Sequence, residues 1–204
     1  MPNLLTARLL LRPLTLADAA GMFELDADPA VHRYLGGIGG PRPASLADSE
    51  ATIRFIEAQY VAHGIGRWAV ALRATGEFMG WAGLKLVTEP VNGQRDFYDI
   101  GYRFIPRYWG QGYGYEAARA WLDYGFATLA LPRICAYADE NNAGSRRILA
   151  KIGLREGNRF VENGTACVWY AADNHAPRPA EAGPPAALAP RQRRANRPRM
   201  PGQI

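Results

Sequence analysis

The sequence of 204 residues contains no apolar run approaching the roughly 18 residues that a membrane-spanning helix needs. Its first residues also lack the basic segment and following apolar segment of a secretory signal. Only two cysteines are present, Cys135 and Cys167, and no CxxC pattern or histidine cluster accompanies them, which argues against a disulfide framework and against a zinc site. We therefore expect a soluble, cytoplasmic protein without a membrane partner or a bound metal, whose cysteines are reduced and structural.

Basic residues are in excess only near the C-terminus. The chain has a formal charge of +5, but residues 175–204 hold six arginines and one acidic residue, which leaves 18 basic and 18 acidic residues in 1–174. The neutral body gives no reason to expect a nucleic-acid-binding face on the folded part. Residues 175–204 are rich in proline, alanine and arginine and are expected to form a disordered basic tail, which either solubilises the protein or contacts RNA, the ribosome or another acidic surface.

Hydrophobic periodicity predicts one α+β domain with the element order βααβββαβαββ around a mixed sheet. Three consecutive strands in the middle are joined by connections too short for crossover helices, so we expect them to be antiparallel. The Asn163-Gly164 pair predicts the turn of a final hairpin. The expected strands are 7–11, 67–72, 77–87, 96–105, 133–138 and the hairpin 154–171, and the expected helices begin near Thr15, cover 46–63, follow Tyr113 and cover 141–153.

The stretch YWGQGYGYEAARAW places Gly110, Gly112 and Gly114 between an expected strand and an expected helix. Without Cβ atoms, backbone N–H groups can close around a ligand, and the N-terminus of the following helix adds partial positive charge, so a phosphate or pyrophosphate is the expected ligand. A Walker loop is disfavoured because no lysine and hydroxyl residue follow. A dinucleotide fold is disfavoured because a strand meander, and not a parallel βαβ unit, leads into the loop. The glycines alone are equally compatible with an ordinary turn from strand to helix.

The same stretch resembles the [QR]xxGx[GA] acyl-CoA loop of the GNAT N-acetyltransferase superfamily, with Trp109, Gly112 and Gly114 in the signature positions. The tryptophan resembles the RimJ/RimL branch of ribosomal-protein N-terminal acetyltransferases, whose usual form is close to yWGkGyatEA. Four further segments match that branch in the same order: ARLLLRPLTLADA, DADPAVHRYLG, DIGYRFIP and NNAGSRRILAKIGL. The resemblance covers residues 6–172 and implies a GNAT domain over 1–174, with a mostly antiparallel central sheet flanked by helices.

The resemblance implies that acetyl-CoA is the co-substrate and that its pantetheine arm lies where two central strands splay apart. Backbone N–H groups of Gln111 to Tyr115 would hold the pyrophosphate, and a backbone N–H near Tyr102 or Phe104 would polarise the thioester carbonyl. The residues expected to contact acyl-CoA are Tyr102, Phe104, Trp109, Gly110, Gln111, Gly112, Tyr113, Gly114, Tyr115, Asn142 and Ser145.

Asp99 is the expected general base. DIGY matches the family's E(L/I)GY and places a carboxylate near the strand gap, where it can act through a water. The alternative is an ordinary strand aspartate that faces solvent. Glu116 matches the branch's tEA and is expected to cap the helix or support the loop.

Ser145 is the expected proton donor to the departing thiolate. Many relatives carry a tyrosine in the helix before KxGF, but this sequence has Leu149 there. Asn142 either orients the pantetheine or caps the helix. Tyr137 and Tyr170 are the alternative donors.

The resemblance implies an acetyl-CoA-dependent N-acetyltransferase in which a primary amine attacks the thioester directly while both substrates are bound. The branch favours a protein N-terminal α-amine, and a small-molecule amine such as an amino acid, a polyamine or an antibiotic is the alternative. A non-catalytic acyl-CoA-binding module is a third interpretation, against which the presence of Asp99, Asn142 and Ser145 argues. A homodimer is compatible with the sequence, which offers no decisive interface signal.

Overall fold

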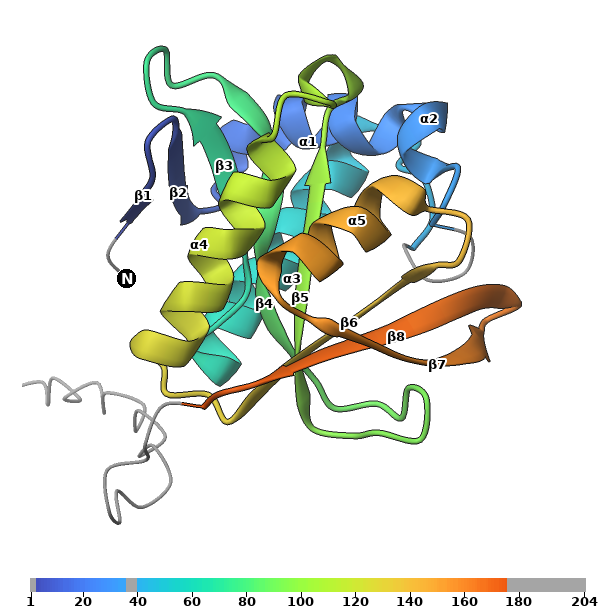
Figure 1. The fold of residues 1–204 in the computed structure, drawn as a ribbon. Helices are drawn as coiled ribbons and strands as arrows, with labels where there is room; N and C mark the ends of the chain where they lie inside the picture. Colours follow the sequence, from blue (N-terminus) through green and yellow to red (C-terminus); the bar gives the residue numbers. More distant parts are fainter. Residues whose placement is uncertain (1–2, 36–39, 176–204) are drawn as a thin grey trace, which may run out of the picture.

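The computed structural model describes residues 3–35 and 40–175. One eight-stranded sheet runs through it in the order β1-β2-β3-β4-β5-β6-β8-β7 (Figure 1). Neighbouring strands pair antiparallel except β5 and β6, which pair parallel, so the predicted mixed and mostly antiparallel sheet is confirmed. The predicted tail, apart from His175, lies outside the described residues. The strands are β1 (Leu4–Leu5), β2 (Leu9–Pro13), β3 (Arg67–Leu72), β4 (Phe78–Val87), β5 (Phe97–Phe104), β6 (Arg133–Asp139), β7 (Arg155–Glu162) and β8 (Thr165–Asp173).

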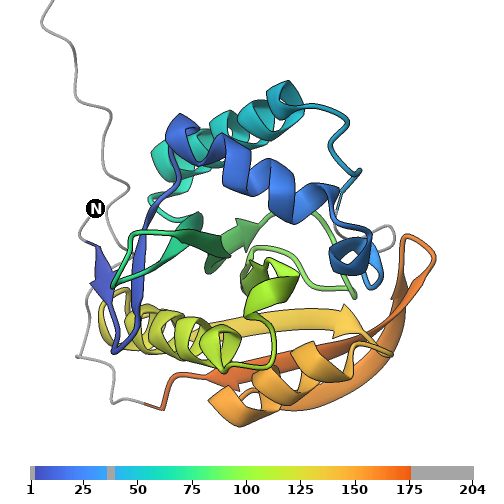
Figure 2. The ribbon, with the colours of Figure 1, turned by 90° about the horizontal axis from the view of Figure 1, so that it is seen from above.

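Helices cover both faces of this sheet. Figure 2 shows α1 and α3 on one face and α4 and α5 on the other. The larger core lies under α4 and α5 and includes the buried Trp68 and Trp121, whereas the smaller core under α1 and α3 includes Met22 and Ile53. None of the helices in the described part of the chain is both long and apolar enough to cross a membrane. The helices are α1 (Ala19–Ala27), α2 (Pro29–His32), α3 (Leu46–His63), α4 (Tyr113–Ala127) and α5 (Ala143–Ile152).

The N-terminal region differs in detail from the predicted strand and helix. The expected strand is a small hairpin, because Thr6 closes a turn between β1 and β2 by accepting a hydrogen bond from Leu9 N–H at its hydroxyl (2.9 Å). Thr15 begins a short 3-10 helix, Leu16–Asp18, before α1. Asp28 then caps an additional short helix, α2, whose first residue is proline, a residue favoured at that position.

Local sequence signals explain most of the other boundaries. Ser45 and Asp48 form a capping box at the start of α3, and Gly64 ends this helix in a left-handed conformation. Asn163 and Gly164 both have positive φ values, of 48° and 80°, which suits the tight turn predicted between β7 and β8.

The parallel pairing of β5 and β6 is very short. Only Tyr98 with Ile134 and Asp99 with Cys135 are partners, although the strands contain eight and seven residues. Beyond Asp99 the two strands separate, and α4 begins beside the far end of β5 (Figure 1). The structure therefore contains the divergence that the family resemblance implies.

Candidate active site

The glycine loop connects β5 to α4, and two of its glycines face open space. Gly110 and Gly112 have φ values of +73° and +83°, a left-handed conformation that glycine adopts without strain. A Cβ on Gly110 would meet no atom within 4 Å, and one on Gly112 would meet only Arg8 Nη2, at 3.4 Å. Gly114 has another role, because a Cβ there would lie 3.0 Å from Ile148 Cδ1 of α5. The first two glycines shape the loop, and the third lets α5 approach α4.

The first turn of α4 leaves backbone donors without helical partners. The earliest backbone bond of this helix runs from Glu116 N–H to the Gly112 carbonyl at 3.0 Å. The N–H groups of Tyr113, Gly114 and Tyr115 precede it and have no acceptor within the helix. Together with the helix dipole, these groups suit an anion such as a phosphate.

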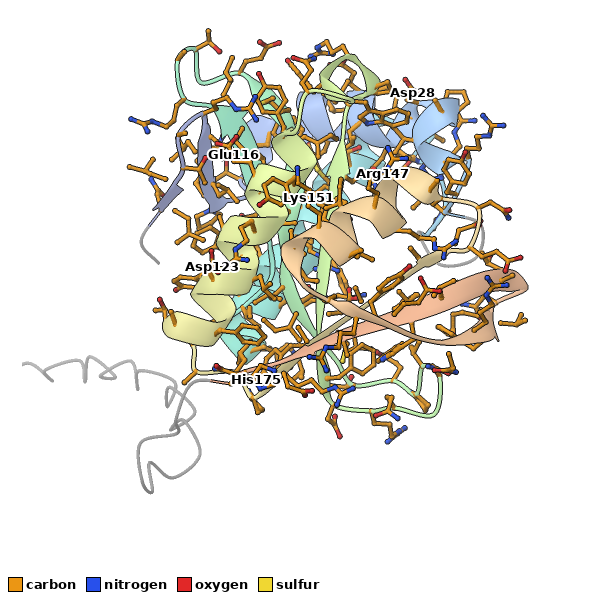
Figure 3. The ribbon with its side chains drawn as sticks, in the orientation of Figure 1. Asp28, Glu116, Asp123, Arg147, Lys151 and His175 are labelled. Atoms are coloured by element: carbon orange, nitrogen blue, oxygen red, sulfur yellow. The ribbon has the colours of Figure 1, made fainter. Side chains whose placement is uncertain are left out.

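Glu116 ties the start of α4 to the N-terminal hairpin (Figure 3). Its carboxylate accepts hydrogen bonds from Thr6 Oγ1 (2.6 Å), Arg8 N–H (2.9 Å) and Arg8 Nε (2.7 Å). Arg8 Nη1 also donates to the Gln111 carbonyl at 3.0 Å. Burial acts to raise the pKa of Glu116, but the hydrogen bonds from Thr6 and Arg8 outweigh it and hold the pKa below its usual value. Glu116 thus supports the loop as an ionised carboxylate, in agreement with the supporting role expected from the sequence.

Side chains of the loop and of α5 complete this support. Trp109 Nε1 donates to the Phe104 carbonyl at 2.6 Å, while the residue as a whole remains 48% exposed. Gln111 Nε2 donates to the Arg107 carbonyl at 2.8 Å. Lys151, labelled on α5 in Figure 3, places its Nζ 4.4 Å from the centroid of the Tyr115 ring. The conformation of the loop is therefore fixed by contacts within the protein.

The backbone of β5 directs two N–H groups toward the side on which β6 diverges. Directly after β5, Ile105 N–H donates to the Met79 carbonyl of β4 at 3.0 Å. Successive N–H groups of an extended chain point to opposite edges, so those of Phe104 and Tyr102 point away from β4. Both predicted candidates for polarising a carbonyl lie on the edge where the strands separate.

The side chain of Tyr102 connects β5 to α5. Its hydroxyl lies 3.0 Å from the Ser145 carbonyl oxygen and 3.1 Å from Ser145 Oγ. Ser145 N–H donates to Asn142 Oδ1 at 3.0 Å, so Asn142 is the N-cap of α5. Burial raises the pKa of Tyr102 far above its usual value, although the Ser145 hydrogen bond acts to lower it. The structure brings the predicted Ser145 and Asn142 together with a phenol that is protonated at neutral pH.

Asp99 occupies the last paired position of β5 before the divergence. It is buried, with 6% of its surface exposed, so the interpretation as a solvent-facing strand aspartate is wrong. Arg67 Nη2 pairs with its carboxylate, and Arg67 Nη1 donates to the Asp99 carbonyl at 2.8 Å and to the Gly83 carbonyl. A Cβ on Gly101 would lie 2.6 Å from Arg67 Nη2, so the glycine of DIGY provides the space for this arginine.

Asp99 and the Tyr102 side chain lie on opposite faces of the sheet, because they are three positions apart on one strand. The Tyr102 face carries α4 and α5, whereas the Asp99 face carries α1 and α3. Of the two alternative donors, Tyr170 is fully engaged: its hydroxyl accepts from Arg146 Nε and donates to Glu156 Oε2, both at 3.0 Å.

Residues 8–155 match the family described as "Acetyltransferase (GNAT) domain", which spans more than half of the sequence. The chain belongs to the GNAT acetyltransferase family. This GNAT protein is 32% identical over 168 residues to an uncharacterized N-acetyltransferase, YoaA, of Bacillus subtilis, covering 80% of the chain and 91% of that relative. It is 33% identical over 162 residues to the FsC-acetyl coenzyme A-N(2)-transacetylase of Aspergillus fumigatus, covering 78% of the chain and 67% of that relative.

The fold of this GNAT protein is also that of solved acetyltransferases. It resembles RimL, a ribosomal L7/L12 alpha-N-protein acetyltransferase in complex with coenzyme A, with a TM-score of 0.68 and 14% identity, over 82% of the chain and 95% of RimL. At this identity the likeness shows the fold alone.

The GNAT domain uses acetyl-CoA, and the protein is an acetyl-CoA-dependent acyltransferase. The described residues fit this co-substrate, because the open space at Gly110 and Gly112 lies beside unpaired N–H groups of α4. Within residues 3–35 and 40–175, no group of three or more His, Cys, Asp and Glu side chains is placed to hold a metal ion.

Sequence reasoning missed Arg8, Arg67 and the hydroxyl of Tyr102. Arg67 begins the otherwise apolar segment RWAVAL, and a lone charge in such a strand is a signal of a buried partner. Arg8 and Tyr102 carry no comparable local signal, because each meets its partner only after the sheet has formed.

Proposed function

We propose that this GNAT enzyme transfers an acetyl group from acetyl-CoA to a primary amine by direct attack, with both substrates bound where β5 and β6 diverge. The observation that carries the proposal is the continuity of the site. The open glycine loop at the start of α4 adjoins the end of β5, and β5 directs two N–H groups toward the divergence.

Binding of the co-substrate is assigned to the loop. Backbone N–H groups from Gln111 to Tyr115 hold the pyrophosphate, assisted by the dipole of α4. Arg8 lies beside Gly112, where its charge favours the same anion. Bound acetyl-CoA supplies the acetyl thioester as the electrophile.

Three groups then serve the transfer, in which a nitrogen–carbon bond forms and the carbon–sulfur bond breaks. Asp99 accepts the proton of the amine through a water, and Arg67 holds its carboxylate in position. The N–H of Tyr102 or Phe104 stabilises the charge that develops on the carbonyl oxygen. Ser145, hydrogen-bonded to the Tyr102 hydroxyl, returns a proton to the sulfur.

Two acceptor classes are supported by different observations. The segment YWGQGYGYEA resembles the RimJ/RimL branch, which favours a protein N-terminal α-amine. The relative named FsC-acetyl coenzyme A-N(2)-transacetylase, at 33% identity, favours a small-molecule amine.

Calorimetric titration with acetyl-CoA, run beside a thiol-release assay over N-terminal peptides and small amines, tests the proposal. We expect acetyl-CoA binding, and turnover with one acceptor class. Binding without turnover of any acceptor would favour a non-catalytic acyl-CoA-binding module. Absence of binding would remove the proposed role of the loop.

The basic tail is proposed to act outside the catalytic domain. A chain ending at Asn174 should keep its acetyl-CoA affinity and turnover. If the tail contacts RNA, only the full chain should bind RNA in a salt-sensitive manner.

A further inference from the structure

Lysine is rare in this protein, and one of its lysines lies on a central strand of the sheet. The chain has 22 arginines but only two lysines, Lys85 and Lys151. Lys151 is exposed on α5, whereas Lys85 lies partly buried on β4, directly opposite Asp99 of β5. Its side chain therefore shares the α1 and α3 face of the sheet with Asp99.

Two carboxylates on this face are engaged by arginines. Asp99, opposite Lys85, pairs with Arg67, and Asp26 of α1 accepts from Arg103 Nη1 at 2.5 Å. The guanidinium carbons of Arg67 and Arg103 lie 5.3 and 5.1 Å from the centroid of the Trp81 ring. Each arginine therefore has a carboxylate and an aromatic ring as partners.

Lys85 has no such partner. Within residues 3–35 and 40–175, no carboxylate lies within 4.0 Å of its Nζ, and no hydrogen bond to it is formed. Burial lowers the pKa of Lys85, although the charges of Asp99 and Glu89 act to raise it. An ammonium that is partly withdrawn from water and lacks a partner is stabilised by an anion supplied from outside.

A hydroxyl without a partner lies on the same face across the divergence. Cys135 of β6 is the neighbour of Asp99, so Tyr137, two positions further, has its side chain on the same face. Its ring stacks on Trp169 with centroids 6.2 Å apart, and among the described residues its hydroxyl forms no hydrogen bond. Burial raises the pKa of Tyr137; the charge of Asp99 also raises it, and the charge of Arg67 lowers it. The hydroxyl is therefore a neutral donor beside the ion pair.

From this arrangement we infer that the Lys85 ammonium and the Tyr137 hydroxyl bind an anionic group of the acceptor, and that the acceptor is an amine that also carries a carboxylate. The inference rests on the proposed function and narrows its acceptor class. It admits amino acids and peptides with an acidic side chain near the N-terminal amine. It disfavours polyamines and aminoglycosides, since Lys85, an ammonium without a carboxylate partner, repels a further cationic group of the acceptor.

Matched acceptors test the inference by turnover. Glycine, β-alanine and 4-aminobutyrate differ in the spacing between amine and carboxylate, and each is compared with its carboxamide. In a second set, N-terminal peptides with Asp or Glu at the second position are compared with peptides that have Asn or Gln there. We expect kcat/KM to favour the carboxylate member of one pair by about tenfold to a hundredfold. A preference for carboxamides or for polyamines would overturn the inference.

Variants assign the preference to the residues. Lys85→Met should abolish it and Tyr137→Phe should reduce it, while Lys85→Arg should retain part of it and Lys151→Met should leave it unchanged. Acetyl-CoA affinity, measured by calorimetry, should be the same in wild type and Lys85→Met. A preference that survives Lys85→Met would overturn the inference without affecting the proposed function, whereas failure of wild type to bind acetyl-CoA would count against the proposed function itself.

A second readout requires no turnover. Reductive methylation with 13C-formaldehyde labels the two lysines and the N-terminus, and Lys85→Arg and Lys151→Arg assign the lysine signals. N-acetylglycine and N-acetyl-β-alanine, with or without CoA, should shift the Lys85 signal and leave that of Lys151, while the corresponding amides should shift neither. Absence of a change in the Lys85 chemical shift with both acids would overturn the inference. Stoichiometric acetylation of Lys85 by acetyl-CoA, detected by mass spectrometry, would also overturn it.

Discussion

The two faces of the sheet around β5 are built by different means. On the α4 and α5 face, backbone groups dominate: left-handed glycines, the unpaired N–H groups of a helix start and the N-cap of α5. On the α1 and α3 face, charged side chains dominate, with the Arg67–Asp99 and Arg103–Asp26 pairs beside Trp81. In the function proposed above, the backbone site holds the acetyl-CoA that is common to every turnover, and the charged side chains contact the acceptor.

The sharpest test of this division compares two buried ion pairs on the same face. Asp99→Asn and Asp26→Asn each leave an arginine without its anionic partner, so both should lower the free energy of unfolding by about 3–5 kcal/mol. Only Asp99→Asn should lower kcat, by about 10²- to 10⁴-fold, because only Asp99 is assigned as the base. Urea unfolding and the thiol-release assay measure the two effects, and an equal loss of kcat in both variants would remove Asp99 from the chemistry.

Gly112→Ala tests the loop on the other face. The φ value of +83° is unfavourable for alanine by about 1–2 kcal/mol, so the loop should relax and acetyl-CoA affinity should fall about tenfold or more. Gly144→Ala in α5 is the matched control, since its Cβ would meet only Asn142 Oδ1, at 3.6 Å. That variant should keep its affinity and gain up to about 1 kcal/mol of stability. Unchanged affinity in Gly112→Ala would contradict the assignment of the loop.

Tyr102→Phe and Tyr170→Phe distinguish a phenol that supports the proton donor Ser145 from a structural phenol. Tyr102→Phe removes the hydroxyl beside Ser145 and should lower kcat about tenfold to a hundredfold. Tyr170→Phe removes a hydroxyl that is hydrogen-bonded to Arg146 and Glu156, and it should lower only the free energy of unfolding, by about 1 kcal/mol. Because burial raises the pKa of Tyr102, the ratio of wild-type to Tyr102→Phe kcat should stay constant as pH rises from neutral to moderately alkaline. A ratio that falls over this range would show that the phenol titrates there.

Glu116→Gln should have the smallest effect, a loss of about 1 kcal/mol in the free energy of unfolding at neutral pH. The pKa of Glu116 is lower in the folded chain than its ordinary value of 4.5, so its ionised form stabilises the fold above that pH. This contribution is lost as pH falls through the folded pKa, and the two proteins should converge in acid. Urea unfolding at pH 7 and at pH values lowered stepwise well below 4.5 measures the difference, with Glu50→Gln, from the exposed pair with Arg54, as a control near zero. A difference that persists in acid would show that the carboxylate charge is not the cause.

The sequence predicted the features that depend on neighbours along the chain. The element order from β3 onward, the glycine loop, the Asn142 cap and the Asn163-Gly164 turn are local, and propensity and spacing are sufficient to locate them. The family resemblance added the splay of the two central strands, which the short register of β5 and β6 bears out.

Contacts between distant positions were not predictable in this way. Arg67 and Asp99 are 32 positions apart, Tyr102 and Ser145 are 43 apart, and Arg8 and Glu116 are 108 apart. Their proximity is decided by strand register and helix packing, so a single sequence indicates that a charge is unusual but not which group it meets. The same limit applies to Lys85, whose lack of a partner becomes visible only when every carboxylate around it has been placed.

Because only two residue pairs join β5 to β6, the sheet consists of two groups of strands with a short connection between them. Strands β1 to β5 form one group and β6, β8 and β7 form the other. The chain passes from the first group to the second through α4 and the segment that includes Pro132. Cutting the chain in that segment should give two fragments that reassociate through the packing of α4 and α5. A molecule that binds in the divergence would contact both groups of strands and so stabilise the reassembled complex. The affinity of the two fragments for each other should therefore increase when that molecule is present.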